Sequence, residues 1–187
     1  MNQFSRALDT LRQLAEDAAT PVVVVGGLAA IHHGVPVITV DVDVVLAPAE
    51  SARFLAKARE RGLTVQRESP AGWHRLVYHD AEGDLEIEVI PAGQRSPRDP
   101  PYAPPIPTPQ ELGVSQGLGY ASFADWAAMK LVANRDKDRY HLGEALRRAT
   151  PEQVAAVVQR LRGLDPSYLR EFERLLRAAE AENSDRW

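Results

Sequence analysis

The run from Val37 to Leu46 constrains the fold of this chain more than any other segment. Apart from Thr39, Asp41 and Asp43, its residues are apolar and most are β-branched, which is typical of a buried or half-buried strand. Side chains two residues apart on a strand lie on the same face, so the carboxylates of Asp41 and Asp43 project together, about 6.5–7 Å apart along the strand. Two ionised carboxylates at that separation repel each other unless a cation lies between them. The segment therefore predicts a strand that carries a divalent-metal site.

The composition excludes several classes of protein. Of the 187 residues, 44% are hydrophobic and 26% are charged, and there is no cysteine to form disulfides or thiolate ligands. No apolar stretch reaches the ~20 residues of a membrane span, and the first residues lack a signal-peptide core, so we expect a cytoplasmic protein without membrane association. The net charge is −4, but the range 130–177 holds 11 basic and 7 acidic residues. That local excess suits either a phosphate-bearing partner or an ordinary solvated helix surface.

Hydrophobic spacing, glycines and prolines divide the chain into elements. They predict helices at residues 3–19, 28–33, 48–61, 122–134, 136–148, 151–163 and 166–182. They predict strands at residues 22–25, 37–46, 63–66, 74–79 and 85–90. Residues 97–109 hold seven of the 14 prolines and cannot form a helix or a central strand. The expected α+β architecture is a mixed β-sheet domain with flanking helices (1–95), a proline-rich connector (96–110) and a helical C-terminal part (111–187).

Two further motifs are candidates to share a site with the aspartates. Gly26 and Gly27 separate a predicted strand from a predicted helix, where glycines allow close approach of the backbone to an anion. A tight turn explains them equally well. Glu86 and Glu88 share one face of a later strand, either in the site or on a solvated surface. If the two acidic strands are neighbours, the four carboxylates converge, and three carboxylates near a phosphate-binding turn suit two Mg²⁺ ions and phosphoryl or nucleotidyl transfer.

Taken together, these motifs resemble the minimal nucleotidyltransferases of the DNA polymerase β superfamily. The closest similarity is to the AbiEii-like and related toxin–antitoxin nucleotidyltransferases. The resemblance spans residues 20–145 and rests on Gly26-Gly27, Ala30, His33-Gly34, the run from Thr39 to Asp43 and the segment from Lys130 to Asp138. It implies a mixed sheet in the nucleotidyltransferase fold, followed by a C-terminal helical bundle.

The resemblance implies a metal-binding role for three carboxylates. Asp41 and Asp43 would bind two Mg²⁺ ions, with Mn²⁺ as a substitute. The third acid of the family falls on Glu88, with Glu86 as the alternative. Glu88 would bind the catalytic metal and help to deprotonate the attacking hydroxyl.

For the nucleotide, the resemblance assigns Gly26 and Gly27 to the triphosphate and Lys130 to the neutralisation of its charge. Val37 and Val40 stand where many relatives have a basic residue. One substrate or phosphate contact of the family therefore lacks its usual residue in this chain.

The implied reaction is attack by an acceptor hydroxyl on the α-phosphorus of an NTP, with release of pyrophosphate. The acceptor is a tRNA 3′ end or a partner protein, in a toxin–antitoxin or related defence system with a cognate toxin or antitoxin. A small drug of the aminoglycoside type is an alternative acceptor. A catalytically inactive interaction module with the same fold is the alternative from a different functional class.

Overall fold

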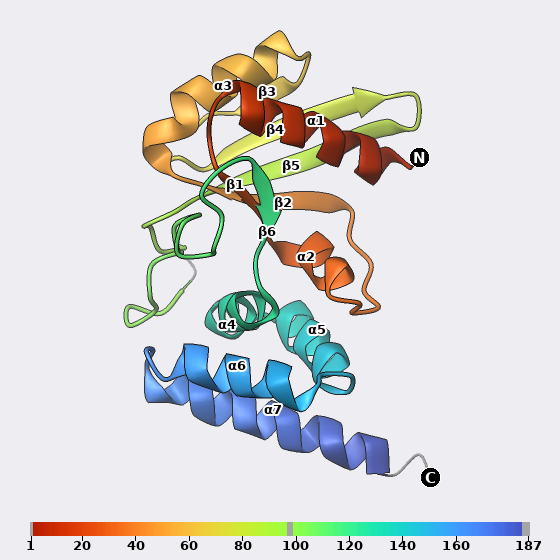
Figure 1. Cartoon of the computed structure of the whole chain (residues 1–187), viewed down its shortest axis with the longest axis vertical. Helices are drawn as coiled ribbons and strands as arrows, with labels where there is room; N and C mark the ends of the chain where they lie inside the picture. The colour runs from red at the N-terminus through yellow and green to blue at the C-terminus, as the bar shows by residue number, and fades with distance from the viewer. Residues whose placement is uncertain (1, 97–98, 185–187) are drawn as a thin grey trace. The chain divides into compact units, whose positions relative to one another are not determined.

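The computed structural model describes residues 2–96 and 99–184 (Figure 1). The chain divides into two compact units. The sheet unit comprises Met1–Ala29, Ile38–Gln94 and Ile106–Ala121, and the helical unit comprises Ala30–Val37, Arg95–Pro105 and Ser122–Trp187. Neither unit is one continuous segment, because the chain passes between them more than once.

A mixed sheet forms the centre of the sheet unit and has six strands within the described residues. In spatial order they are β3 (Thr64–Arg67), β4 (His74–Asp80), β5 (Gly83–Pro91), β2 (Asp41–Leu46), β1 (Val22–Val24) and β6 (Leu118–Tyr120). β2 is parallel to β5 and β1 is parallel to β6, whereas the other neighbouring pairs are antiparallel. The predicted α+β class with a mixed sheet is confirmed.

One face of the sheet packs against α1 (Gln3–Asp17) and α3 (Ser51–Glu60), which lie side by side (Figure 1). A short 3₁₀ turn, η1 (Pro48–Glu50), leads into α3. The core joins apolar side chains of both helices to alternate residues of the central strands: Leu11, Leu14, Phe54, Leu55, Val42, Val44, Leu46, Leu85, Ile87 and Val89. Because strand side chains alternate between faces, the acidic residues between these strand positions lie on the face opposite α1 and α3.

The start of β2 differs from the prediction. The apolar run begins at residue 37, but its first residue to pair with a neighbouring strand is Asp41. Ile38 and Val40 are 90% and 79% exposed. These residues are β-branched but have no strand beside them and no core to pack against, so they form an irregular segment before β2.

The predicted division into 1–95, 96–110 and 111–187 also differs from the structure. Residues 106–121 belong to the sheet unit, because β6 pairs with β1 and Val22 donates a backbone hydrogen bond to Gly117 at 2.8 Å. The close packing of β6 depends on Gly119, where an added Cβ would lie 2.5 Å from a methyl carbon of Val114. The described part of the proline-rich region forms no helix or strand, as predicted, while Pro97 lies outside the described residues.

The helical unit contains α4 (Phe123–Ala133), α5 (Asp136–Leu146), α6 (Pro151–Leu161) and α7 (Pro166–Ser184). These bounds confirm the predicted C-terminal helices to within two residues at each end. Ser122 caps α4 by accepting a hydrogen bond from the backbone of Asp125, and Thr150 forms a capping box with Gln153 before α6. The largest fully buried side chains of the unit are Trp126, Leu142, Leu161 and Phe172. Among the helices of the described chain, none combines the length and apolarity needed to cross a bilayer.

Candidate functional site

Asp41 and Asp43 lie on β2, on the sheet face opposite α1 and α3. Both are half-buried, since the valines that alternate with them point into the core. Thr39 donates a hydrogen bond from its hydroxyl to Asp41 Oδ1 at 2.8 Å and also contacts the Asp41 carbonyl oxygen at 3.2 Å. Thr39 therefore orients the Asp41 carboxylate. Sequence reasoning misses this role, for which the only signal is one hydroxyl within an apolar run.

Glu86 and Glu88 lie directly beside the two aspartates. The parallel register of β2 and β5 pairs Asp41 with Glu86 and Asp43 with Glu88. Paired residues on neighbouring strands project to the same face at a strand spacing of about 4.8 Å. The two acidic strands are therefore neighbours, which is the condition stated above, and the four acidic residues lie on the same face. Of the two glutamates, Glu88 is the more buried, with 20% of its side chain exposed against 48% for Glu86.

Gly26 and Gly27 begin α2 (Gly26–His32) and lie against the aspartate strand. A Cβ on Gly26 would fall 1.8 Å from Asp43 Oδ2, and a Cβ on Gly27 would fall 2.5 Å from Thr39 Oγ1. Gly26 also has a φ of +62°, which is costly for any residue with a side chain. The structure therefore places the glycine pair at the aspartates. Its assignment to a triphosphate stays a prediction.

Substitution of Gly26 by alanine tests how closely the glycine and aspartate segments fit. We expect the free energy of unfolding to fall by about 2–5 kcal/mol, because a positive φ costs about 1–2 kcal/mol and an overpacked contact costs about 1–3 kcal/mol. Gly62→Ala is the matched control, since Gly62 has a φ of +81° but nothing within 4 Å of an added Cβ. It should cost only about 1–2 kcal/mol. Urea denaturation measures both, and equal losses would contradict the proposed packing.

Two arginines hold Glu88. Arg75 of β4 donates a hydrogen bond from Nε to Glu88 Oε1 at 2.6 Å, and its Nη1 lies 3.5 Å from Glu86 Oε1. Arg67 of β3 donates from Nη2 to Glu88 Oε2 at 3.1 Å. The hydrogen bond to Glu88 and the charge of Glu88 raise the pKa of Arg75 above its ordinary value. Both carboxylate oxygens of Glu88 therefore contact guanidinium groups.

The aspartate pair fits a divalent cation better than the glutamates do. Carboxylate oxygens are the ligands that Mg²⁺ prefers. Asp41 and Asp43 lie on one face of β2, and Asp43 lies beside Gly26. Glu88 is instead bonded to arginines. In residues 2–96 and 99–184, no group of three or more His, Cys, Asp or Glu side chains is arranged to hold a metal ion. The residues therefore fit a cation held by the two aspartates, while Glu88 is bonded to Arg67 and Arg75.

Lys130, the predicted neutraliser of the triphosphate, lies on α4 in the helical unit. Its side chain is 8% exposed, and its Nζ is 2.7 Å from Oδ1 of Asp138, which is fully buried. Arg135 donates two hydrogen bonds to Oδ2 of Asp138, one from its Nε at 2.5 Å and one from its backbone N–H at 3.3 Å. Burial alone would raise the pKa of Asp138, but the bond from Arg135 and the charge of Lys130 hold it below its ordinary value. The observed contact of Lys130 is structural, and its role toward phosphate stays a prediction.

No family model matches the chain, and no curated protein matches it. Several solved structures are similar to it, among them two of ANT(2″)-Ia and one of JHP933. The solution structure of the antibiotic-resistance factor ANT(2″)-Ia aligns with 99% of this chain and 96% of that chain, at 13% identity and a TM-score of 0.47. A crystal structure of ANT(2″)-Ia in complex with adenylyl-2″-tobramycin aligns with 97% of this chain and 99% of that chain, at 13% identity and a TM-score of 0.48. JHP933 from Helicobacter pylori aligns with 99% of this chain and 97% of that chain, at 10% identity and a TM-score of 0.48. With scores this low, function has to be inferred from the residues of the chain itself.

Proposed function

We propose that this protein is a metal-dependent nucleotidyltransferase that moves an NMP from an NTP to an acceptor hydroxyl. The observation that carries the proposal is the register of β2 and β5, which sets Asp41 and Asp43 level with Glu86 and Glu88. Gly26 packs against the carboxylate of Asp43. A sheet face with clustered acids next to a glycine turn suits chemistry on a phosphate ester.

Each residue of the site has a defined task in this proposal. Asp41 and Asp43 would hold Mg²⁺ or Mn²⁺, which when bound neutralises negative charge on the transferred phosphoryl group. Thr39 keeps the Asp41 carboxylate in one orientation, so no rotamer has to be selected when the cation arrives. Glu88 is the candidate base for the acceptor hydroxyl. Gly26 and Gly27 bring the backbone close to Asp43 and Thr39, beside which a triphosphate would lie.

The acceptor that we propose is a tRNA 3′ end or a partner protein, in a toxin–antitoxin or related defence system. An RNA acceptor is favoured by the local excess of positive charge, because the range 130–177 holds 11 basic and 7 acidic residues, of which Lys130 is buried against Asp138. Transfer to a small drug of the aminoglycoside type is the alternative acceptor chemistry.

Incorporation of label tests the proposal directly. The protein is incubated with each α-labelled NTP, Mg²⁺ or Mn²⁺, and total RNA, cell lysate or an aminoglycoside. Label on small RNA supports the tRNA acceptor, label on a protein supports a partner protein, and label on the drug supports the alternative. A folded protein that labels nothing with any NTP would contradict the enzymatic proposal.

A catalytically inactive interaction module is the second candidate, and the arginine pairing of Glu88 favours it. A carboxylate whose two oxygens already bond to Arg67 and Arg75 is less available to a metal. The inactive module predicts that Asp41→Ala leaves partner binding intact and that no NTP is consumed. The label experiment therefore separates the two candidates.

Substitution of each glutamate decides which one serves as the third carboxylate. Glu88→Gln should lower the rate of nucleotidyl transfer by about 100-fold or more, as expected for loss of a general base. Glu86→Gln should change the rate by less than about 3-fold, because Glu86 is the more exposed and lies farther along β5 from Gly26 and Asp43. Initial rates of label incorporation measure both, and the reverse order of effects would assign the role to Glu86.

A further inference from the structure

One row of charged side chains crosses four strands of the sheet unit. The strand registers pair Asp43 with Glu88, Glu88 with Arg75, and Arg75 with Arg67. Paired residues lie on the same face of a sheet. Two acidic residues on β2 and β5 are therefore followed on that face by two arginines on β4 and β3. Arg75 and Arg67 therefore approach Glu88 from the side away from Asp43.

The place of Arg67 in this row depends on a β-bulge. Val65 pairs with Leu76, yet Arg67 pairs with Arg75, so two steps along β3 match one step along β4. In a regular ladder, Arg67 would lie one position further along and on the core face. The extra residue turns Arg67 to the face that carries the carboxylates, which is a typical effect of a bulge.

The negative charge of Glu88 is therefore neutralised only from the side of β4 and β3, where the two arginines lie. Its Oε1 bonds to Arg75 and its Oε2 bonds to Arg67, and Arg75 also reaches Glu86. A carboxylate with two guanidinium partners attracts a divalent cation more weakly than a free carboxylate does. Bonding to both arginines also directs the Glu88 side chain toward β4 and β3 instead of toward the aspartates on β2.

We propose that Arg75 is a positioning residue that competes with the metal for Glu88. While Arg75 holds Glu88, the cation is bound by Asp41 and Asp43 alone. Glu88 becomes the third ligand only when Arg75 releases it, because the bond that remains, 3.1 Å long, comes from Arg67, whose side chain is 52% exposed. This inference rests on the proposed function, because it requires a divalent cation at the aspartates.

Mn²⁺ binding to the full chain without nucleotide tests the competition. Arg75→Met keeps most of the side-chain volume but removes the guanidinium, so Mn²⁺ should bind about 5–10-fold more tightly than to the wild type, a modest coupling between two sites. Glu88→Gln alone should change the affinity by less than about 2-fold, because Glu88 contributes little in the arginine-held state. Calorimetry or the electron paramagnetic resonance signal of free Mn²⁺ gives the dissociation constants.

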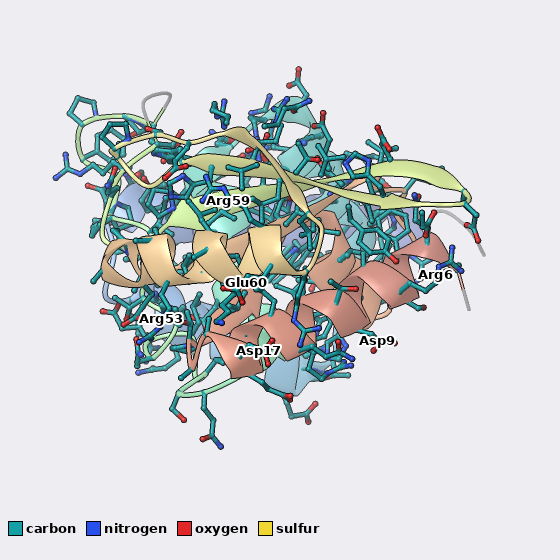
Figure 2. The ribbon with its side chains drawn as sticks, turned by 90° about the horizontal axis from the view of Figure 1, so that it is seen from above. Arg6, Asp9, Asp17, Arg53, Arg59 and Glu60 are labelled. Carbon is teal, nitrogen blue, oxygen red and sulfur yellow. The ribbon has the colours of Figure 1, made fainter. Side chains whose placement is uncertain are left out.

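The double variant Arg75→Met/Glu88→Gln separates release of Glu88 from the simple loss of a positive charge. If Arg75 acts through Glu88, the tighter binding disappears in the double variant. If the tighter Mn²⁺ binding persists in Arg75→Met/Glu88→Gln but disappears in Arg75→Met/Glu86→Gln, the released ligand is Glu86 and the proposal for Glu88 is wrong. Arg59→Met is the charge control on α3, at the opposite face of the sheet (Figure 2), and should leave Mn²⁺ binding unchanged.

Failure of this inference can be told apart from failure of the proposed function. If the wild type binds Mn²⁺, Asp41→Asn abolishes binding and Arg75→Met has no effect, the competition is wrong but the metal site stands. If no Mn²⁺ binds in an Asp41-dependent way, both the metal site and the competition are overturned. Thermal melting of each variant verifies that it is folded.

Discussion

Replacement of Asp43 by asparagine is expected to lower nucleotidyl transfer on the order of 10³-fold, equivalent to about 4 kcal/mol of transition-state stabilisation. Asparagine keeps the shape of the side chain beside Gly26 but removes the charge that would hold a cation. The free energy of unfolding should change by about 1 kcal/mol or less, because the amide still accepts hydrogen bonds and one repulsive charge of the acidic cluster is gone. Initial rates of label incorporation and urea denaturation measure the two effects.

Asp9→Asn is the matched control for this prediction. Asp9 lies on α1, which packs on the opposite face of the sheet, and its side chain is 46% exposed (Figure 2). The same change of charge and shape there should leave the transfer rate unaltered and the stability within about 0.5 kcal/mol. Full activity of the Asp43 variant would show that β2 does not contribute to the active site.

The sequence predicted the helices and most strands because their signals are local. The buried faces of α1 and α3 follow helical spacing, and the alternation on β5 from Leu85 to Val89 follows strand spacing. Both aspartates could be placed on one face for the same reason. The irregular segment at 37–40 could not be told from a strand, because β-branched residues favour strands whether or not a neighbouring strand is present.

Features that depend on register could not be predicted. β6 is three residues long with a central glycine, so Leu118 to Tyr120 carry almost no strand signal before β1 is known to lie beside them. The bonds from Arg67 and Arg75 to Glu88 require the order of β3, β4 and β5, and the bond from Arg67 also requires the bulge. The metal site at the aspartates could therefore be predicted from neighbouring residues in the sequence, whereas the arginine contacts of Glu88 depend on how the strands assemble.

Replacement of Asp138 by asparagine is expected to destabilise the protein by about 3–5 kcal/mol, because it leaves the nearly buried ammonium of Lys130 without its partner. Asp138 also accepts the backbone hydrogen bond that starts α5, so the helix loses part of its cap. Asp136→Asn is the control, since Asp136 lies two residues earlier on α5 with its side chain 98% exposed. The control should cost less than about 1 kcal/mol. Urea denaturation followed by circular dichroism measures both, and similar losses would contradict a central role for the buried pair.

The same pair predicts how stability depends on pH. The pKa of Asp138 is lower in the folded protein than its ordinary value, so the unfolded chain binds a proton at Asp138 at a higher pH than the folded protein does. The stabilisation is therefore fully present above about pH 5 and is lost as the pH falls below about 4 toward the folded-state pKa. In Asp138→Asn this acid-dependent loss should be smaller, since no carboxylate titrates at that position. Urea midpoints between pH 3 and 7 measure the difference, and parallel curves for the wild type and the variant would show that another group controls acid unfolding.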